Sequence, residues 1–381
     1  MMVKDYIIIF SFIFTLVFSS CNEKAWVPGT PLAKEKIIIG VIHITNPFVE
    51  DSGYSYAHQS GIEEMKEILE ISDSQVLYRT NVDDLDPLHI ESRIRELIAQ
   101  GANIILATSW GYMDICEKLA IEYPSVIFAH ATGYKYNDTN FTNYFGRVYQ
   151  ARYLSGIVAG MQTKTNKIGF VAAWGLDNSE VTGGLNAFAM GIERVNPDAQ
   201  IYVKVTHSWF DPMGEASAAR TLISAGCDVI TQHCDTANPQ LEAQRAGVWG
   251  IGYNTDMSID APDSVLTSVI WNWGAYYTML VRSVIDGTFN AAPWFGSLND
   301  GIIDLVPLNR RINFEPSLNE SGSFDILDEE RRRIESGVFN VFSGIIETND
   351  GRKIGREGED FSDNDIRNNI NWYYKNINVI R

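Results

Sequence analysis

The sequence predicts an α/β protein built from two lobes, and two observations carry this prediction. A chain of 381 residues, 45% of them hydrophobic, is longer than one hydrophobic core usually accommodates, so two cores are expected. Short apolar runs alternate with amphipathic stretches from Lys36 onward, and the same alternation begins again after Tyr149. Near-continuous apolar strands separated by helices are typical of parallel sheets covered on both faces.

The N-terminal segment is typical of an exported lipoprotein. Lys4 precedes an apolar run, Tyr6–Phe18, and two serines separate this run from Cys21. The run is too short to span a bilayer comfortably, and its ending at a cysteine after small residues resembles a bacterial lipoprotein signal. Residues 1–20 are therefore predicted to be a signal peptide, and Cys21 is predicted to carry the lipid. An uncleaved membrane anchor is the alternative interpretation.

Residues 21–35 are expected to tether the folded protein to the membrane. Pro28, Gly29 and Pro31 interrupt this stretch, which has no sustained hydrophobic period. Lipid and tether together predict a location in the cell envelope, where the protein faces the periplasm or the exterior.

Two series of strands and helices follow the tether. The strands expected in the first lobe are KIIIGVIHI, SQVLYRT, NIILATS and VIFAHATG, separated by helices near residues 55–69, 88–100 and 113–122. The strands expected in the second lobe are KIGFVAAW, IYVKVTHSWF, DVITQHC and WGIGYN, with helices after Tyr149, near residues 182–195 and 214–225, and up to Ala246. Because α/β sheets bind ligands at the carboxyl ends of their strands, a cleft between the lobes is the expected site.

The overall charge excludes one class of partner. The chain has 48 Asp and Glu residues against 30 Lys and Arg residues, a net charge of −18. This charge repels phosphate backbones, so no nucleic-acid partner is expected. The acidic residues are dispersed through the sequence, which indicates a solvated surface.

The cysteines do not predict a metal site. Cys116, Cys227 and Cys234 form no CxxC pair and no zinc spacing. Cys234 lies between His233 and Asp235, but adjacent residues of a strand point to opposite faces. No metal and no cofactor are predicted, and the three thiols are expected to be buried structural residues.

Aromatic and polar residues recur where the predicted strands end. In DSGY, after the first strand, Gly53 lets the backbone approach a ligand and Tyr54 can stack on one. Further candidates at strand ends are Trp110, His130, Trp174, Trp209 and Gln232. Rings from two lobes would sandwich a flat heteroaromatic ligand, and the polar groups would bind its edge. The alternative is that each aromatic residue simply packs beneath a loop.

Two further patterns are interpreted as structural. His130 and His233 are expected to form hydrogen bonds and not to act as a catalytic or pH-switching pair. Asp211 followed by Pro212 predicts the beginning of a helix, with aspartate as N-cap and proline in the first turn.

Five segments together resemble a known family. DSGYSYAH, FAHATGY, SWFDPMGEA, DVITQHCD and SVIWNWGAYY are similar to segments of the basic membrane protein family of solute-binding lipoproteins. FSGIIETNDG and INWYYKNINV extend the similarity toward the C-terminus. The resemblance implies a type I periplasmic-binding-protein fold, in which two Rossmann-like lobes are joined by a three-strand hinge. It also implies an ABC permease as partner and purine nucleosides or bases as ligands.

The implied fold divides the chain at the hinge. The first lobe would comprise residues 36–143 and about 272–295, and the second lobe residues 144–271 and about 296–381. The hinge would lie near Asn140–Val148 and Ser268–Trp273, and the lobes would close on the ligand.

The resemblance also implies particular contacts. Tyr54 falls where the family has an aromatic residue that stacks on the base, and Trp209 falls where it has the opposing ring. Asp256 matches a family aspartate that can accept hydrogen bonds from the base. Thr132 and Trp271 stand where the nucleoside receptors have a ribose-binding aspartate and a lysine. Polar groups expected for a sugar are therefore missing, so a free purine base such as adenine is expected, with Trp271 as an extra ring at the site.

These observations predict the solute-binding lipoprotein of an ABC importer, acting as a monomer. An enzyme is not expected, because the chain has no GxSxG elbow, no GxxxxGK[ST] loop, no HExxH motif and no GxGxxG after a strand. The alternative functions are a ligand sensor that signals to a membrane receptor and, with less support, a nucleoside hydrolase.

Overall fold

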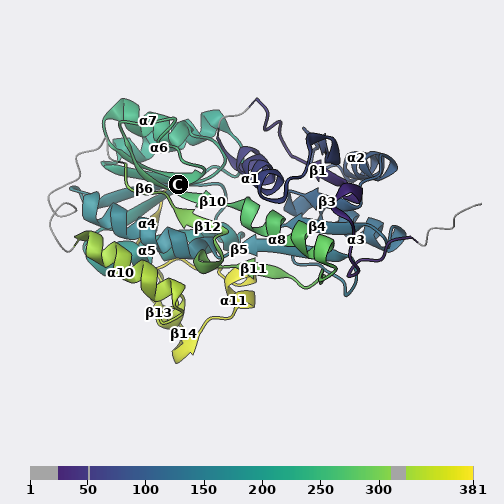
Figure 1. Ribbon diagram of the computed structural model, residues 1–381. Helices are drawn as coiled ribbons and strands as arrows, with labels where there is room; N and C mark the ends of the chain where they lie inside the picture. The colour runs from purple at the N-terminus through teal and green to yellow at the C-terminus, as the bar shows by residue number, and fades with distance from the viewer. Residues whose placement is uncertain (1–24, 50–51, 310–322, 381) are drawn as a thin grey trace, which may run out of the picture.

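The computed structural model describes residues 25–49, 52–309 and 323–380. The predicted signal peptide and Cys21 lie outside these residues. Two separate sheets form the centres of two lobes, with hinge elements between them (Figure 1). Within the described ranges, none of the helices combines the length and apolar character that a membrane crossing needs.

The first lobe contains a parallel sheet of six strands in the order β11-β5-β4-β3-β1-β2. Its strands are β1 (Ile39–Ile42), β2 (Val76–Arg79), β3 (Ile104–Ala107), β4 (Ile127–Ala131), β5 (Phe141–Gly146) and β11 (Trp294–Gly296). Its helices are α1 (Tyr54–Leu69), α2 (Pro87–Ala99), α3 (Met113–Glu122) and α8 (Trp273–Asp286), with 3-10 turns η1 (Lys34–Lys36), η2 (Asp73–Gln75) and η3 (Trp110–Tyr112).

Successive residues of these strands build two different cores. Ile39 and Val41 of β1 pack in the cluster that includes residues of α1 and α8. Ile42 and Ile105 pack in the cluster that includes residues of α2 and α3. Side chains of a strand alternate between faces, so both faces of this sheet are covered, as the apolar runs in the sequence predict.

The second lobe contains a seven-stranded sheet in the order β12-β10-β9-β8-β6-β7-β15, in which all pairs are parallel except β10 with β12. Its strands are β6 (Lys167–Ala172), β7 (Gln200–Val205), β8 (Val229–His233), β9 (Trp249–Asn254), β10 (Val265–Trp271), β12 (Ile303–Leu305) and β15 (Ile377–Val379). Its helices are α4 (Val148–Gln162), α5 (Ser179–Val195), α6 (Pro212–Ser224), α7 (Asn238–Ala246), α10 (Ser323–Glu335) and α11 (Asp363–Asn368). A hairpin of β13 (Ser343–Glu347) and β14 (Lys353–Asp360) and the turn η4 (Leu298–Asp300) complete the described elements.

The chain passes between the two sheets three times. The passages lie between β5 and α4, between β10 and α8, and between β11 and β12. The predicted lobe boundary after residue 143 falls inside β5, which pairs with β4 and β11, so the first sheet continues to Gly146. The residues Phe141–Gly146, FTNYFG, contain no proline and only a terminal glycine, so the sequence carries no break at residue 143.

The described part of the predicted tether packs against the first lobe. Leu32 is buried, and its backbone N–H donates a hydrogen bond to the Val284 carbonyl of α8 at 3.1 Å. Trp26 packs against the core, and its indole N–H donates to the Thr30 carbonyl at 3.0 Å. The two large apolar side chains of this segment are therefore partly or fully removed from water, and residues 25–35 follow the surface of the first lobe before β1 begins.

Aromatic rings stack across the hinge. The His58 ring lies 4.1 Å from Trp273, and Trp273 lies 4.6 Å from Trp271, with nearly parallel planes in both pairs. Trp271 stacks in turn on Phe145 at 5.0 Å, and Phe145 lies 6.2 Å from Phe295. The stack joins residues of α1, α8, β10, β5 and β11, so the packing of the hinge depends on both lobes.

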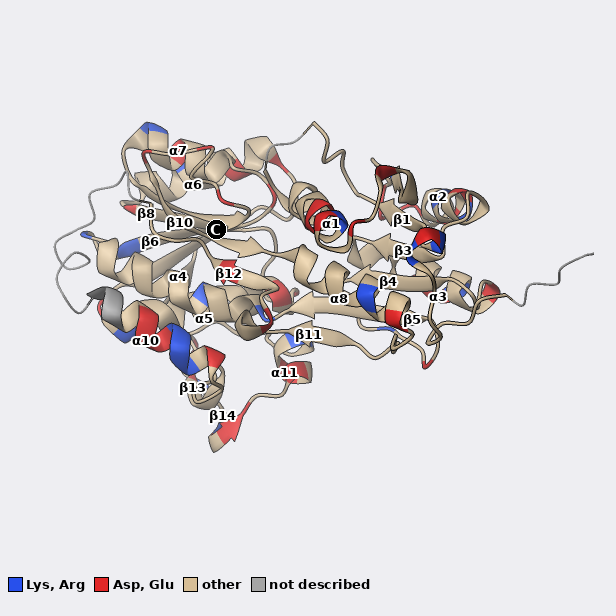
Figure 2. Cartoon of the chain, in the orientation of Figure 1, with Lys and Arg blue, Asp and Glu red and all other residues tan. Residues whose placement is uncertain are grey.

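Local predictions about charge, thiols and capping are confirmed. Acidic and basic residues are distributed over the elements of both lobes (Figure 2). Cys116, Cys227 and Cys234 are free and buried. Asp211 is the N-cap of α6, where its carboxylate accepts a hydrogen bond from the Gly214 N–H at 3.0 Å and Pro212 begins the helix.

Candidate functional site

The two lobes touch at the beginning of α1. The Gly53 N–H donates to the Thr255 hydroxyl at 3.4 Å, and the Ser52 hydroxyl lies 3.5 Å from the Asp260 carboxylate. Gly53 has φ of +95°, and a Cβ atom there would lie 2.6 Å from the carbonyl oxygen of Asp235 in the second lobe. Only glycine meets both the backbone conformation and the close approach, so this sequence is suited to a closed arrangement of the lobes.

Tyr54 presents the first ring at this contact. It begins α1, it is half-buried, and its ring meets His58 edge-on at 4.5 Å and Trp273 at 6.2 Å. Burial raises the pKa of Tyr54 well above its ordinary value, and the neighbouring Tyr144 and Glu180 raise it further. The phenol therefore stays neutral, and groups of both lobes surround it.

The second lobe presents rings of its own. Trp174 and Trp209 follow β6 and β7, and their centroids lie 6.5 Å apart. Trp209 lies 6.1 Å from the ring of His233, which lies 4.4 Å from Tyr253. Both tryptophans are half-buried, so each keeps part of its surface available to a ligand.

Several buried polar atoms beside these rings have unused hydrogen-bonding capacity. Asn254 Oδ1, His233 Nδ1, His58 Nε2 and Trp273 Nε1 have no hydrogen-bond partner among the described residues. Asn254 also has φ of +69°, and its amide nitrogen donates to Asp235 Oδ1 at 3.1 Å. Most buried polar groups of proteins are paired, so this concentration of unpaired donors and acceptors suits a polar ligand.

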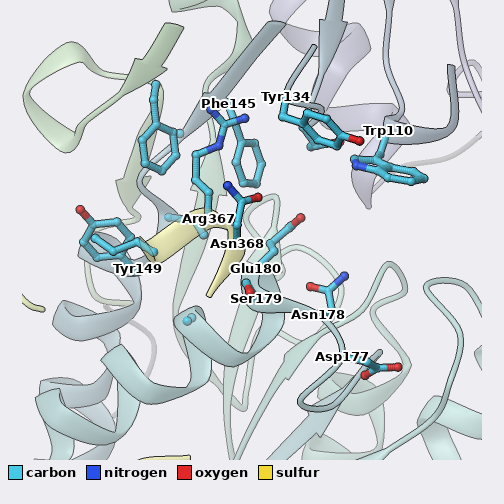
Figure 3. A pocket seen from close by; sticks show the side chains of 17 residues that line it. Trp110, Tyr134, Phe145, Tyr149, Asp177, Asn178, Ser179, Glu180, Arg367 and Asn368 are labelled. Carbon is cyan, nitrogen blue, oxygen red and sulfur yellow. The ribbon is translucent and has the colours of Figure 1, made fainter. Parts of the chain in front are cut away.

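A cavity of about 320 Å³ lies between the lobes next to this cluster. Its walls come from strand ends of the first lobe, from the beginning of α5, and from α11 (Figure 3). The residues that line it include Trp110, Tyr134, Asn178, Glu180 and Arg367. Rings on one side and polar side chains on the other are typical of sites for small organic ligands.

Glu180 connects the cavity with the buried cluster. Its Oε1 lies 3.3 Å from His233 Nε2, and its side chain is 23% exposed. Burial raises the pKa of Glu180 to about 7, although the positive charges of Arg152 and Arg367 lower it in part. Burial also holds the pKa of His233 well below its ordinary value. A neutral histidine therefore faces a carboxyl group that titrates near neutrality and can accept or donate a hydrogen bond.

The structure brings together four of the residues that the sequence predicts for the site. Tyr54, Trp174 and Trp209 surround the buried cluster. Trp110 lines the cavity and is 57% exposed. These rings come from strand ends and helix beginnings of both lobes, as the sequence analysis expects.

The other predicted residues are engaged elsewhere. His130 Nε2 is hydrogen-bonded to the Lys135 carbonyl at 3.0 Å, inside the first lobe. The buried Gln232 amide donates to the Cys234 carbonyl at 3.2 Å, and the Asp256 carboxylate accepts from the Ser258 N–H in the turn after β9. Trp271 is buried in the hinge stack, where its indole N–H donates to the Tyr253 hydroxyl at 3.2 Å.

Three residues of the site are absent from the sequence-based set. Glu180 stands in the first turn of α5, which begins with Asn178 as N-cap, and that capping signal after β6 could have indicated it. Asn254 ends β9 in a left-handed conformation, which asparagine tolerates. Arg367 comes from the far C-terminus, and no local signal connects it with the cavity.

The donor groups of the site do not suggest a metal. Among the described residues, no group of three or more His, Cys, Asp and Glu side chains is placed to hold an ion. The chemistry that the described side chains supply is stacking and hydrogen bonding, together with a carboxyl group, Glu180, whose pKa is raised to about 7.

A two-lobed fold with rings and polar groups facing one another between the lobes is the arrangement expected of a solute-binding protein. The chain belongs to the PnrA-like family of ABC transporter substrate-binding proteins, Bmp, whose sequence model matches residues 38–334. Its partners are accordingly a small-molecule ligand and the permease of an ABC transporter.

Two of the proteins similar to this chain are named for different ligands. A purine-binding protein of Brucella abortus (strain 2308) is 33% identical over 349 residues, which cover 92% of this chain and 95% of the relative. An ABC transporter protein of Haloferax volcanii, TsgA13, named for glucose binding, is 34% identical over 72% of this chain and 68% of its own length. Basic membrane protein A2 of Borrelia garinii is 23% identical over 79% of this chain and 87% of its own.

Solved structures show the same fold. An ABC transporter solute-binding protein from Conexibacter woesei DSM 14684 matches with a TM-score of 0.66 and 21% identity, covering 80% of this chain and 98% of its own. One from Aeropyrum pernix K1 matches with a TM-score of 0.66 and 17% identity, covering 80% and 92%. The chain thus has the predicted type I periplasmic-binding-protein fold.

Proposed function

We propose that this protein binds a purine, with a free base such as adenine favoured over a nucleoside, between its lobes and delivers it to the permease by hinge closure. The observation that carries the proposal is the buried cluster around Tyr54, where rings of both lobes surround Asn254, His233, His58 and other polar groups with unused hydrogen-bonding capacity. A purine offers two flat faces for the rings and an edge of alternating donors and acceptors for the polar atoms.

The purine name of the Brucella abortus relative supports this ligand class, because that similarity extends over nearly all of both chains. The glucose name of the Haloferax volcanii relative makes hexoses the necessary comparison. Preference for the base rests on the residues that replace the family's sugar-binding groups. Trp271 has its only donor engaged by Tyr253, and Thr132 supplies no charge.

Calorimetric titration of the refolded mature chain without its lipid, residues 22–381, tests the ligand class. The panel contains adenine, hypoxanthine, guanine, the matching nucleosides and glucose, and refolding removes any ligand carried through purification. We expect the tightest binding for a base. Tight binding of nucleosides would contradict the base preference, and binding of glucose alone would contradict the purine assignment.

The site assignment is tested by Trp209→Ala. Loss of stacking and burial should weaken binding by about 1–3 kcal/mol, roughly 5- to 150-fold in Kd. Trp249→Ala is the control, because Trp249 is also a half-buried tryptophan of the second lobe but begins β9 at the end of the strand away from the cleft. Equal binding by the two variants would contradict the assignment.

We also propose that the protein is a lipid-anchored monomer of the cell envelope and that it does not turn over its ligand. The sequence around Cys21 supports the anchor. Palmitate labelling in cells should be abolished by Cys21→Ala, and light scattering should give the monomer mass. Release of a free base from a nucleoside on incubation with the protein would instead favour the hydrolase alternative.

A further inference from the structure

The helix α11 belongs to a part of the chain beyond the family match, which ends at residue 334. Its position is nevertheless fixed by the second lobe. Asn186 of α5 donates through its side-chain amide to the Trp372 carbonyl at 2.8 Å and accepts from the Tyr374 N–H at 2.9 Å. Ser362 and Asp365 form a capping box at the beginning of α11. The segment therefore holds Arg367 in a defined place on the cavity wall.

Arg367 is held by the first lobe but keeps hydrogen-bonding capacity. Its Nη2 donates to the Gly133 carbonyl at 2.5 Å and lies 3.4 Å from Asn143 Oδ1, and its guanidinium group lies over the Phe295 ring at 5.1 Å. Among the described residues, the hydrogen bonds of Arg367 all involve Nη2, so the N–H groups of Nε and Nη1 are unused donors. Arg367 is half-buried, and unused donors of a partly desolvated guanidinium favour an acceptor in the cavity.

Arg147 provides a direct contrast. It lies over the same Phe295 ring at 4.8 Å, but it is paired with Asp363 of α11, with the Nη2 and Oδ2 atoms 2.7 Å apart. Among the described residues, no carboxylate oxygen lies within 4.0 Å of the Arg367 guanidinium. Arg147 does not line the cavity, whereas Arg367 does. The structure thus separates an arginine that fastens α11 from one that faces the cavity.

Glu180 faces the same cavity from α5. The charges of Glu180 and Arg367 influence each other, yet the two groups form no ion pair. A guanidinium donor and a carboxyl acceptor separated by a cavity match a ligand edge that carries an acceptor beside a donor. The edges of purine bases have this pattern, with ring nitrogens or a carbonyl oxygen next to N–H groups.

We propose that Arg367 is a specificity-determining residue, which donates a hydrogen bond to an acceptor atom on the edge of a planar nitrogen heterocycle while Glu180 binds a donor on the same edge. The inference rests on the proposed function and adds to it the polar contacts that select the ligand. A charge-assisted hydrogen bond is stronger than a neutral one, so loss of the Arg367 contact should weaken binding about ten- to a hundredfold.

The test compares Arg367→Gln with Arg147→Gln by calorimetry, using whichever of adenine, hypoxanthine and guanine binds the wild type most tightly. Both substitutions remove a cation from the Phe295 ring and loosen α11, so both should lower Tm. Only Arg367→Gln should weaken binding by the stated factor, while Arg147→Gln should stay within about threefold of the wild type. If Arg367→Gln does not fold, Arg367→Lys takes its place, with a smaller loss expected because lysine keeps the charge but not the planar fork.

Analogues that each lack one acceptor atom of the same base identify the contact. One analogue should bind wild type and Arg367→Gln with the same affinity, because it lacks the atom that Arg367 binds. Equal losses for every analogue would show that Arg367 only fastens the lobes, and equal affinity of the two arginine variants would also overturn the inference. If the wild type binds none of the purines, the proposed function fails and the inference fails with it.

Discussion

Replacing Gly53 with alanine should separate the stability of the fold from the closure of the lobes. An alanine at φ of +95° is strained in every state of the protein, at a cost of about 1–3 kcal/mol in the free energy of unfolding. The added Cβ would also lie 2.6 Å from the Asp235 carbonyl, and this second conflict exists only when the lobes are closed. Real Cβ atoms essentially never approach another atom closer than 3.0 Å, so either the two lobes must move apart or the backbone on one side of the contact must shift. Such overpacking typically costs about 1–3 kcal/mol, roughly a 5- to 150-fold rise in Kd.

Gly101→Ala is the matched control. Gly101 has φ of +97°, and nothing lies within 4 Å of the position of its Cβ, so it carries backbone strain without a contact between the lobes. Urea unfolding should show a loss of stability in both variants, whereas calorimetry should show weakened binding only for Gly53→Ala. Small-angle scattering with saturating ligand should also report a larger radius of gyration for Gly53→Ala. Identical affinities of the two variants would show that Gly53 and Asp235 do not meet in the ligand-bound state.

Three further predictions follow from buried and capping groups. Trp273→Ala should lower the free energy of unfolding by about 3–5 kcal/mol in urea titrations, since Trp273 is fully buried in the hinge stack, whereas Trp110→Ala should change it little because Trp110 is 57% exposed. The pKa of Glu180 is raised to about 7 in the folded state, so the folded protein binds more protons than the unfolded chain between about pH 5 and pH 7, and the stability due to this group falls as pH rises. Glutamine does not titrate, so the free energy of unfolding of Glu180→Gln should rise relative to that of the wild type as the pH increases from about 5 to about 7. If the difference in unfolding free energy between the two proteins stays constant over this range, the raised pKa is contradicted. Asp211→Ala should cost about 1 kcal/mol through the lost cap of α6 without changing ligand affinity, and Asp211→Ser should restore most of that loss.

The fold could be predicted because its signals are local. Apolar runs such as the one at Ile39–Ile42 have no polar face, and this fixes a strand covered on both sides. The helix predicted near residues 113–122 coincides with α3, and the cap at Asp211 places the beginning of α6. The edges of elements were less certain, as β5 shows, because the strand passes through residue 143 to its terminal glycine, Gly146, and only its pairing with β11 reveals that it continues.

The site could be predicted only where it follows strand ends. Tyr54 and Trp209 are found at the interface because the topology of parallel sheets brings strand ends to one edge. His130 also follows this rule, but its ring turns inward to the Lys135 carbonyl, and strand position does not determine such a choice. Arg367 could not be predicted, since its approach to Gly133 joins residues 234 positions apart in the sequence.

The buried polar cluster gives a physical reason for closure to depend on ligand. When the lobes meet, Asn254 and His233 of the second lobe and His58 of the first are removed from water while part of their hydrogen-bonding capacity stays unused. A buried donor or acceptor without a partner costs about 1–3 kcal/mol. When the lobes separate, water can bind the groups that become exposed, so for these groups the cost arises only when the lobes close. A ligand that supplies partners removes the cost, and its rings and edge contact both lobes at once. Closure would then be favoured by the ligand and disfavoured without it, which is the differential affinity that a permease needs in order to distinguish the loaded protein from the empty one.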